Sequence, residues 1–178
     1  MSLVISVVGR SNSGKTTLLE KLIVELKKRG HTVAAVKHSG SDFQLDHPGK
    51  DSWRLTEAGS DAVLLVSSNR LALMQKASRS PTFQEVIDSL GDKYDFILVE
   101  GFKESNTPRI EVHRKELGGL VSPPERLLAV VTDEELDLDL PIPQFSSHDG
   151  AALVDLLESS LASPDLAARR LPESISGA

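Results

Sequence analysis

Residues 9–16 read GRSNSGKT, and this spacing of small, basic and hydroxyl residues suits the binding of phosphate. Gly9 and Gly14 allow backbone angles and a close approach of a ligand that a Cβ atom would block. The N–H groups of such a loop, in which we include Asn12 and Ser13, point inward as a nest for an anion, and the N-terminus of a following helix reinforces it. These residues predict a phosphate-binding loop.

Three side chains at the end of this loop suit a nucleoside triphosphate with Mg²⁺. Lys15 can reach the β- and γ-phosphates, Thr16 offers its hydroxyl to Mg²⁺, and Thr17 is placed to touch the α-phosphate. The alternative is a Gly/Ser-rich turn before a capped helix, although chance matches to G-x-x-x-x-G-K-[ST] are rare in a chain of this length. An apolar segment before the loop and a helical pattern after it favour the phosphate loop.

The stretch DFILVEGFK, residues 95–103, places a carboxylate at the end of an apolar strand. Ligands bind at the carboxyl ends of parallel strands, where Glu100 can hold the hydration shell of Mg²⁺ or orient a water molecule. Acidic residues at strand ends are also common without any such role, but the phosphate loop and the following Gly101 favour the functional interpretation. Lys103 is a weaker candidate, because a solvated loop lysine explains it equally well.

Charged side chains are dense between residues 36 and 59, namely Lys37, His38, Asp42, Asp46, His47, Lys50, Asp51 and Arg54. They follow the second predicted strand, as substrate or metal loops do. Asp46 is a candidate for contact with Mg²⁺ or the attacking water, and Lys50 and Arg54 for phosphate, although solvated loop charges explain each of them as well. Three histidines offer a further metal site, but their spacing fits no standard one: His38, His47 and His113.

The elements around these residues predict an α/β fold. Residues 3–8 are nearly all apolar, which is typical of a strand covered on both faces. Residues 15–29 carry leucines at helical spacing and end in cations before Gly30, so that with a strand in residues 31–38 they form a βαβ unit. Further helices are predicted at 50–58, 82–90 and 149–161, and further strands at 61–68, 70–77, 95–100, 109–114, 127–132 and 142–147.

Some details of these elements can be tested. Thr82 and Glu85 have the spacing of a capping box, and Asp149 stands at the N-cap position of the last helix. The segments 61–68 and 70–77 are expected to pair through a tight turn. The alternating pattern in 109–114 predicts a strand near a sheet edge.

Composition limits the class of protein. The 178 residues suit one domain, which we place at residues 1–163 and follow with a loosely ordered tail at 164–178. The net charge of −6 argues against nucleic-acid binding. Apolar runs are too short for a membrane span or a signal peptide. The chain has no cysteine, which excludes disulfides and thiolate metal sites and favours a cytoplasmic location.

Taken together, three stretches resemble the molybdopterin-guanine dinucleotide biosynthesis protein B (MobB) family over roughly residues 3–155. They are VVGRSNSGKTTL, DHPGKDSWR with AGSDAV, and YDFILVEGFK with PRIEV. The resemblance implies a P-loop NTPase with a Rossmann-like three-layer sandwich and a mostly parallel central sheet, forming a homodimer. It also implies binding of GTP and Mg²⁺, weak GTP hydrolysis, and a role as accessory to the molybdopterin guanylyltransferase, with molybdopterin itself a possible ligand.

On this analogy the loop residues from Gly14 to Thr17 bind GTP and Mg²⁺, and Glu100 is the acidic residue of the second motif. No N-K-x-D motif is present to read guanine. The candidate in its place is Asp133, which follows a buried strand and can accept hydrogen bonds from the edge of the base. Guanine preference therefore rests on the resemblance.

The residues alone leave three functions open: an accessory GTPase, a small-molecule kinase or ligase, and a nucleotide-dependent interaction module or metal-insertion chaperone. A kinase needs a basic lid over the γ-phosphate, for which Arg79 is thin support, and metal-insertion GTPases often use cysteine. Hydrolysis by Lys15, Mg²⁺ and a water oriented by Asp46 or Glu100 is expected to be slow. The one arginine inside the loop, Arg10, would have to act across a dimer.

Overall fold

The computed structural model describes residues 2–40, 46–102 and 105–162, and the chain divides into two compact units. The larger unit contains residues 1–38 and those from 87 onward, and the smaller unit contains residues 39–86. The expected single domain at 1–163 stays a prediction. Asp42, Lys103 and the tail at 164–178 lie outside the described residues.

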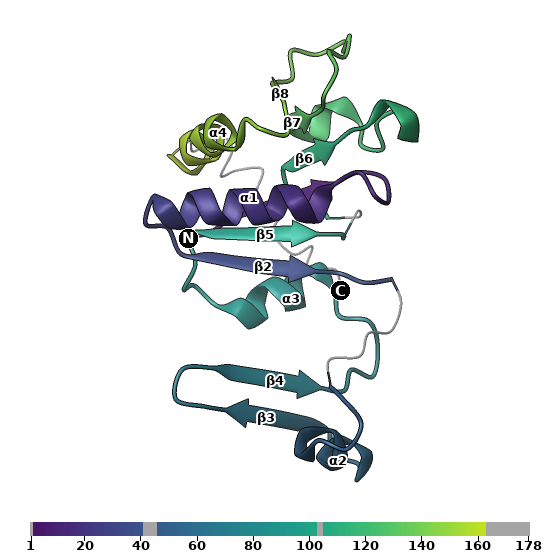
Figure 1. The fold of residues 1–178 in the computed structure, drawn as a ribbon, viewed down its shortest axis with the longest axis vertical. Coiled ribbons are helices and arrows are strands. Elements are labelled where there is room, and N and C mark those ends of the chain that lie inside the picture. The colour runs from purple at the N-terminus through teal and green to yellow at the C-terminus, as the bar shows by residue number, and fades with distance from the viewer. Residues whose placement is uncertain (1, 41–45, 103–104, 163–178) are drawn as a thin grey trace, which may run out of the picture. The chain divides into compact units, whose positions relative to one another are not determined.

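The larger unit is built on a six-stranded sheet in the order β2-β5-β1-β6-β7-β8, in which every neighbouring pair is parallel (Figure 1). All six strands therefore end at the same edge, which we call the carboxyl edge. The prediction of an α/β fold with a mostly parallel central sheet is confirmed. The strands are β1 (Leu3–Val8), β2 (Val33–Lys37), β5 (Phe96–Glu100), β6 (Arg109–Val112), β7 (Leu127–Val131) and β8 (Gln144–Phe145).

Two helices, α1 (Lys15–Lys28) and α4 (Gly150–Ala162), pack against the sheet and against each other. Leu22 and Leu26 of α1 are fully buried, as the helical spacing of the leucines predicted. They share one apolar cluster with Ile5 of β1 and Leu157 of α4. This cluster fixes the position of α1 relative to β1, and therefore holds both ends of the loop that joins them.

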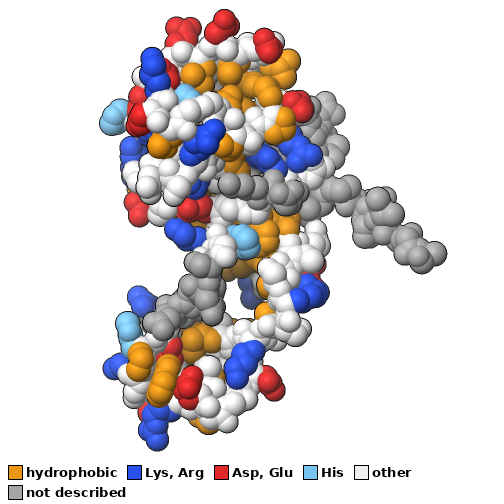
Figure 2. All heavy atoms as spheres, turned by 90° about the vertical axis from the view of Figure 1, so that its right-hand side faces the viewer, with side chains coloured by type: hydrophobic (Ala, Val, Ile, Leu, Met, Phe, Trp, Pro, Cys, Tyr) orange, Lys and Arg blue, Asp and Glu red, His pale blue; other side chains and the backbone are white. Residues whose placement is uncertain are grey.

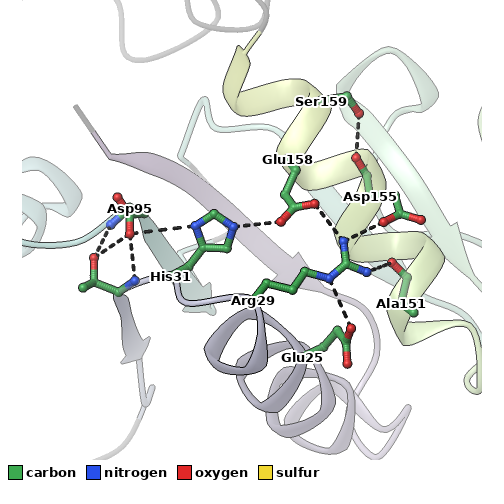
Figure 3. Close-up of polar contacts among 9 residues, drawn as sticks. Glu25, Arg29, His31, Asp95, Ala151, Asp155, Glu158 and Ser159 are labelled. Atoms are coloured by element: carbon green, nitrogen blue, oxygen red, sulfur yellow. Dashed lines mark hydrogen bonds and ion pairs between the residues drawn. The ribbon is translucent and has the colours of Figure 1, made fainter.

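A polar network joins the C-terminal end of α1 to α4 (Figure 3). Arg29, just after α1, donates to Glu25 at 3.1 Å and to three residues of α4: Asp155 at 2.6 Å, Glu158 at 2.7 Å and the carbonyl of Ala151 at 3.0 Å. The ring of His31 contacts Glu158 at 2.8 Å. The hydrogen bonds from His31 and Arg29 hold the pKa of the Glu158 carboxyl below its usual value. These bonds stabilise the packing of α4 at the end of the sheet away from the carboxyl edge.

The strand β6 corrects one prediction. It lies between β1 and β7, and all four of its residues are buried, so the expectation of a position near an edge is wrong. The alternation arose from polar side chains that are buried and paired. Arg109 donates to the Ser105 carbonyl at 2.8 Å, and the Glu111 carboxylate accepts backbone N–H groups from residues 121 and 122 at 2.6 and 2.9 Å.

After β6 the chain forms two short 3₁₀ helices, Lys115–Leu117 and Pro124–Arg126, before β7 begins. Before α4, Asp149 takes the predicted cap position, since its carbonyl accepts the N–H of Leu153. Its carboxylate accepts the backbone N–H of Ser146 at 2.8 Å, which fixes the turn that precedes the helix.

The smaller unit contains the helix α2 (Asp51–Glu57) and an antiparallel hairpin of β3 (Ala62–Val66) and β4 (Leu71–Gln75), as predicted. The helix α3 (Phe83–Leu90) spans the boundary of the two units. Its capping box is confirmed: the backbone N–H of Glu85 donates to the Thr82 hydroxyl at 3.3 Å, and the backbone N–H of Thr82 donates to the Glu85 carboxylate at 2.8 Å. Within the described ranges, no helix is long and apolar enough to cross a membrane.

Candidate functional site

The loop between β1 and α1 has the positive φ angles for which the phosphate-loop prediction uses its glycines. Gly9 and Gly14 have φ angles of +137° and +97°, and Asn12 has a φ of +62°. A Cβ atom on Gly9 would clash with the carbonyl oxygen of Val112 on the neighbouring strand β6. Glycine is therefore required where the loop leaves the sheet, and the reason is the close approach of β6.

Two observations at the loop are consistent with an anionic ligand. The Ser13 side chain is buried, and its hydroxyl has no hydrogen-bond partner among the described residues. The Lys15 ammonium lies across the loop and donates to the Arg10 carbonyl at 2.8 Å. A buried polar atom and a lysine held over an amide-lined loop are features that a bound phosphate would satisfy.

The fold brings Glu100 to the phosphate loop. Its carboxylate accepts a hydrogen bond from the Thr16 hydroxyl at 2.9 Å, although the two residues are far apart in the sequence. The Lys37 ammonium lies 3.5 Å from the same carboxylate oxygen, because β2 and β5 pair with Lys37 opposite Glu100. A hydroxyl beside a carboxylate is an oxygen donor set of the kind that Mg²⁺ prefers, so these residues fit the predicted metal.

The turn after Glu100 is held tightly against β2. Gly101 has a φ of +105°, and a Cβ atom there would lie 2.8 Å from the Cβ of His38. The ring of His38 packs on that of Phe102, with centroids 4.3 Å apart. His113 is buried near the Thr132 hydroxyl. Among the described residues, no group of three or more His, Asp or Glu is arranged to hold a metal, so the histidine site gains no support.

On the other side of the phosphate loop is a cavity of about 220 Å³. Thr17 and Lys21 of α1, Arg114 after β6 and Ser147 after β8 are among the residues that line it. Asp133, the predicted guanine contact, follows β7 and lies 3.3 Å from the Arg114 guanidinium. It also lines a second, open hollow of about 430 Å³ with Gln144 and Phe145.

Sequence reasoning missed Arg114. The signal was available, because Arg114 follows a predicted strand just as Glu100 does, and all such strands end at one edge. The guanidinium of Arg10, the arginine inside the loop, donates to the Gly119 carbonyl at 3.4 Å, in the loop that follows β6.

The other predicted residues belong to the smaller unit. The Asp46 carboxylate accepts the backbone N–H of His47 at 2.8 Å. Lys50 precedes α2, and Arg54 forms an exposed ion pair with Asp51 at 3.5 Å. Contacts of these residues with the phosphate loop stay predictions. Figure 2 views the larger unit from its carboxyl edge, where basic and acidic side chains reach the surface among hydrophobic ones.

Residues 4–133 match the family model of molybdopterin guanine dinucleotide synthesis protein B. The chain belongs to this family. The matched range includes every predicted site residue, from the phosphate loop through Glu100 to Asp133. MobB membership therefore confirms the resemblance that the three sequence stretches indicated.

Relatives and solved structures agree with the MobB assignment. The chain is 42% identical over 141 residues to the molybdopterin-guanine dinucleotide biosynthesis adapter protein of Haemophilus influenzae, covering 76% of this chain and 77% of the relative. It is 37% identical over 154 residues to the Escherichia coli adapter protein, covering 80% and 85%. A crystal structure of molybdopterin-guanine biosynthesis protein B superposes with a TM-score of 0.72 at 29% identity, covering 90% of this chain and all of the other.

Proposed function

We propose that this MobB protein binds GTP with Mg²⁺, hydrolyses it slowly, and acts as an accessory protein in molybdopterin guanine dinucleotide biosynthesis. The observation that carries the proposal is the hydrogen bond between Thr16 and Glu100 at the mouth of the phosphate loop. It places a hydroxyl and a carboxylate together next to Lys15, as Mg²⁺-dependent phosphoryl chemistry requires. The pathway is that of the adapter proteins of Haemophilus influenzae and Escherichia coli, which are named for molybdopterin-guanine dinucleotide biosynthesis.

In this proposal the residues act by position and charge. Bound Mg²⁺ would neutralise charge that develops on the phosphates. Lys15 would exchange its bond with the Arg10 carbonyl for the β- and γ-phosphates, while the loop amides and the α1 N-terminus hold the phosphate oxygens. Thr16 would turn from Glu100 to the metal, and Glu100 would then hold a metal-bound water or orient the attacking one.

Slow turnover without a partner is part of the proposal. Arg10 is engaged by the Gly119 carbonyl, and Arg79 forms an ion pair with Glu85, so each of these guanidinium groups is already engaged by another group of the protein. The pairing of Arg79 also weakens the kinase alternative, which needs a basic lid. In this proposal, hydrolysis serves the handover of a nucleotide or cofactor to a partner such as the guanylyltransferase. Asp133 accepts hydrogen bonds from the edge of the guanine base, and molybdopterin is a further ligand. A cytoplasmic location, suited to a cysteine-free chain, completes the proposal.

We further propose that the protein is a homodimer that uses the hairpin of β3 and β4. Leu64 pairs with Leu73 and Val66 with Leu71, so the four side chains share one face of the hairpin. They are between 53% and 70% exposed. Hydrophobic side chains are visible at the surface of the smaller unit (Figure 2). An exposed apolar face on a two-stranded sheet, which is marginally stable alone, supports burial against a second copy.

A nucleotide-binding panel tests the function. Calorimetry with GTP and ATP, each with and without Mg²⁺, is expected to show Mg²⁺-dependent preference for GTP. Lys15→Ala should lose about 1.5–3 kcal/mol of binding free energy, or roughly 10- to 150-fold in affinity. Lys28→Ala, which removes an exposed lysine at the other end of α1, is the matched control. Unchanged GTP affinity in Lys15→Ala would refute the site, and a preference for ATP would favour the kinase.

A further inference from the structure

Arg114 is held in a defined position beside the phosphate loop. Its side chain is 21% exposed, and its Nη1 atom donates to the His113 carbonyl at 2.9 Å and lies 3.3 Å from the Asp133 carboxylate. Its Nη2 atom lies 3.6 Å from where a Cβ atom on Gly14 would be. The guanidinium therefore faces the loop from the side of β6.

The loop that follows Arg114 is anchored to the strand β6. The Glu111 side chain is buried, and its carboxylate accepts the backbone N–H groups of Val121 and Ser122. Gly118 of the same loop packs against the Arg10 guanidinium. The partly exposed ion pair between Arg114 and Asp133 contributes little to stability by itself. The backbone hydrogen bonds that Glu111 accepts, together with the contacts of Arg114, hold this segment in one position, which suits a preorganised binding site.

The two sides of the phosphate loop have different chemistry. On the side of β5 and β2, Thr16 meets Glu100, and the turn at Gly101 is packed against His38. On the side of β6, β7 and β8 lies the cavity of about 220 Å³, lined by Arg114 and Thr17 among others. A triphosphate whose metal-bound end lies at the Thr16–Glu100 pair would direct its nucleoside into this cavity.

We propose that Arg114 contacts the nucleoside end of the bound nucleotide and that Asp133 positions its guanidinium. The inference rests on the proposed binding of GTP and adds a residue that lies outside both the phosphate loop and the stretch that contains Glu100. A guanidinium suits the task, because it stacks on flat aromatic rings and donates several hydrogen bonds in a fixed plane. The Asp133 carboxylate lies 3.3 Å from Nη1 of Arg114, close enough to position a guanidinium that lines the cavity.

The test is calorimetry of the full chain with GTP and GDP, and competition of GTP by inorganic tripolyphosphate, all with Mg²⁺. Arg114→Gln should weaken GTP and GDP by the same factor, about ten-fold or more. The dissociation constant of tripolyphosphate, obtained from the competition, should be the same for Arg114→Gln and the wild type, because tripolyphosphate has no nucleoside. Lys115→Gln is the matched control, since Lys115 is the next residue, carries the same charge and is 83% exposed beside Glu134.

Arg114→Lys and thermal unfolding guard against a folding defect. The lysine variant keeps the charge but not the plane, so it should fold like wild type and still bind GTP more weakly. If Arg114→Gln matches the Lys115→Gln control, or if tripolyphosphate loses as much affinity as GTP, the inference is wrong while GTP binding stands. Absence of GTP binding by the wild type would instead refute the proposed function, and the inference with it.

Discussion

Exchanging Glu100 for glutamine separates metal-dependent chemistry from phosphate binding. In the structure the carboxylate accepts the Thr16 hydroxyl at 2.9 Å and lies 3.5 Å from the Lys37 ammonium. The Glu100→Gln side chain has the same shape and retains an oxygen that can accept the Thr16 bond. What it loses is the negative charge, and with it the attraction for Mg²⁺ and the ability to take a proton from water.

The expected magnitudes follow from these contacts. The lost ion pair involves a lysine side chain that is 66% exposed, so folding stability should change by less than about 1 kcal/mol. Affinity for GTP without Mg²⁺ should change by less than about five-fold, since the loop amides and Lys15 are intact. Hydrolysis with Mg²⁺ should fall by about 100-fold or more, as expected when a residue that orients or activates water is removed.

The assay is single-turnover GTP hydrolysis with protein in excess, beside calorimetric GTP binding with and without Mg²⁺. Glu20→Gln removes an exposed carboxylate from α1 and should leave both unchanged. A Glu100→Gln protein that loses Mg²⁺-free GTP affinity as strongly as hydrolysis would refute the reasoning, because Glu100 would then be structural. Unchanged hydrolysis would exclude Glu100 from the chemistry.

Two further predictions concern the smaller unit. Leu73→Glu places a charge on the apolar hairpin face and should convert a dimer into a monomer in sedimentation equilibrium, whereas Ala72→Glu on the opposite face should not; a dimeric Leu73→Glu protein would contradict the proposed interface. The hydrogen bond from Arg79, together with those from the backbone and side chain of Thr82, lowers the pKa of Glu85 from 4.5 to about 2, so these contacts stabilise the fold above pH 4.5 and their contribution is lost as the pH falls toward 2. Carboxyl NMR titration should show the Glu85 pKa rising in Arg79→Gln, and identical values in the two proteins would rule out this cause.

Much of the fold could be predicted from local patterns. The phosphate loop, the strand before it and the helix after it depend on glycine backbone freedom and on leucine spacing within 30 residues. The hairpin and the capping box at Thr82 are likewise local, and both were predicted correctly. In each case the interacting groups are near neighbours in the sequence, so residue type and spacing carry the information.

Strand order decided the rest. Glu100 meets Thr16 because β5 lies beside β1, and Arg114 reaches the opposite side of the phosphate loop because β6 lies on the other side of β1. The same order buried β6, whose polar residues had indicated an edge. Periodicity reports which face of a strand is apolar but not which strand will be its neighbour. The sequence by itself therefore determined the glycine-rich loop and the elements on either side of it, for which phosphate binding is the proposed role, and only the tertiary structure decided which distant side chains surround it.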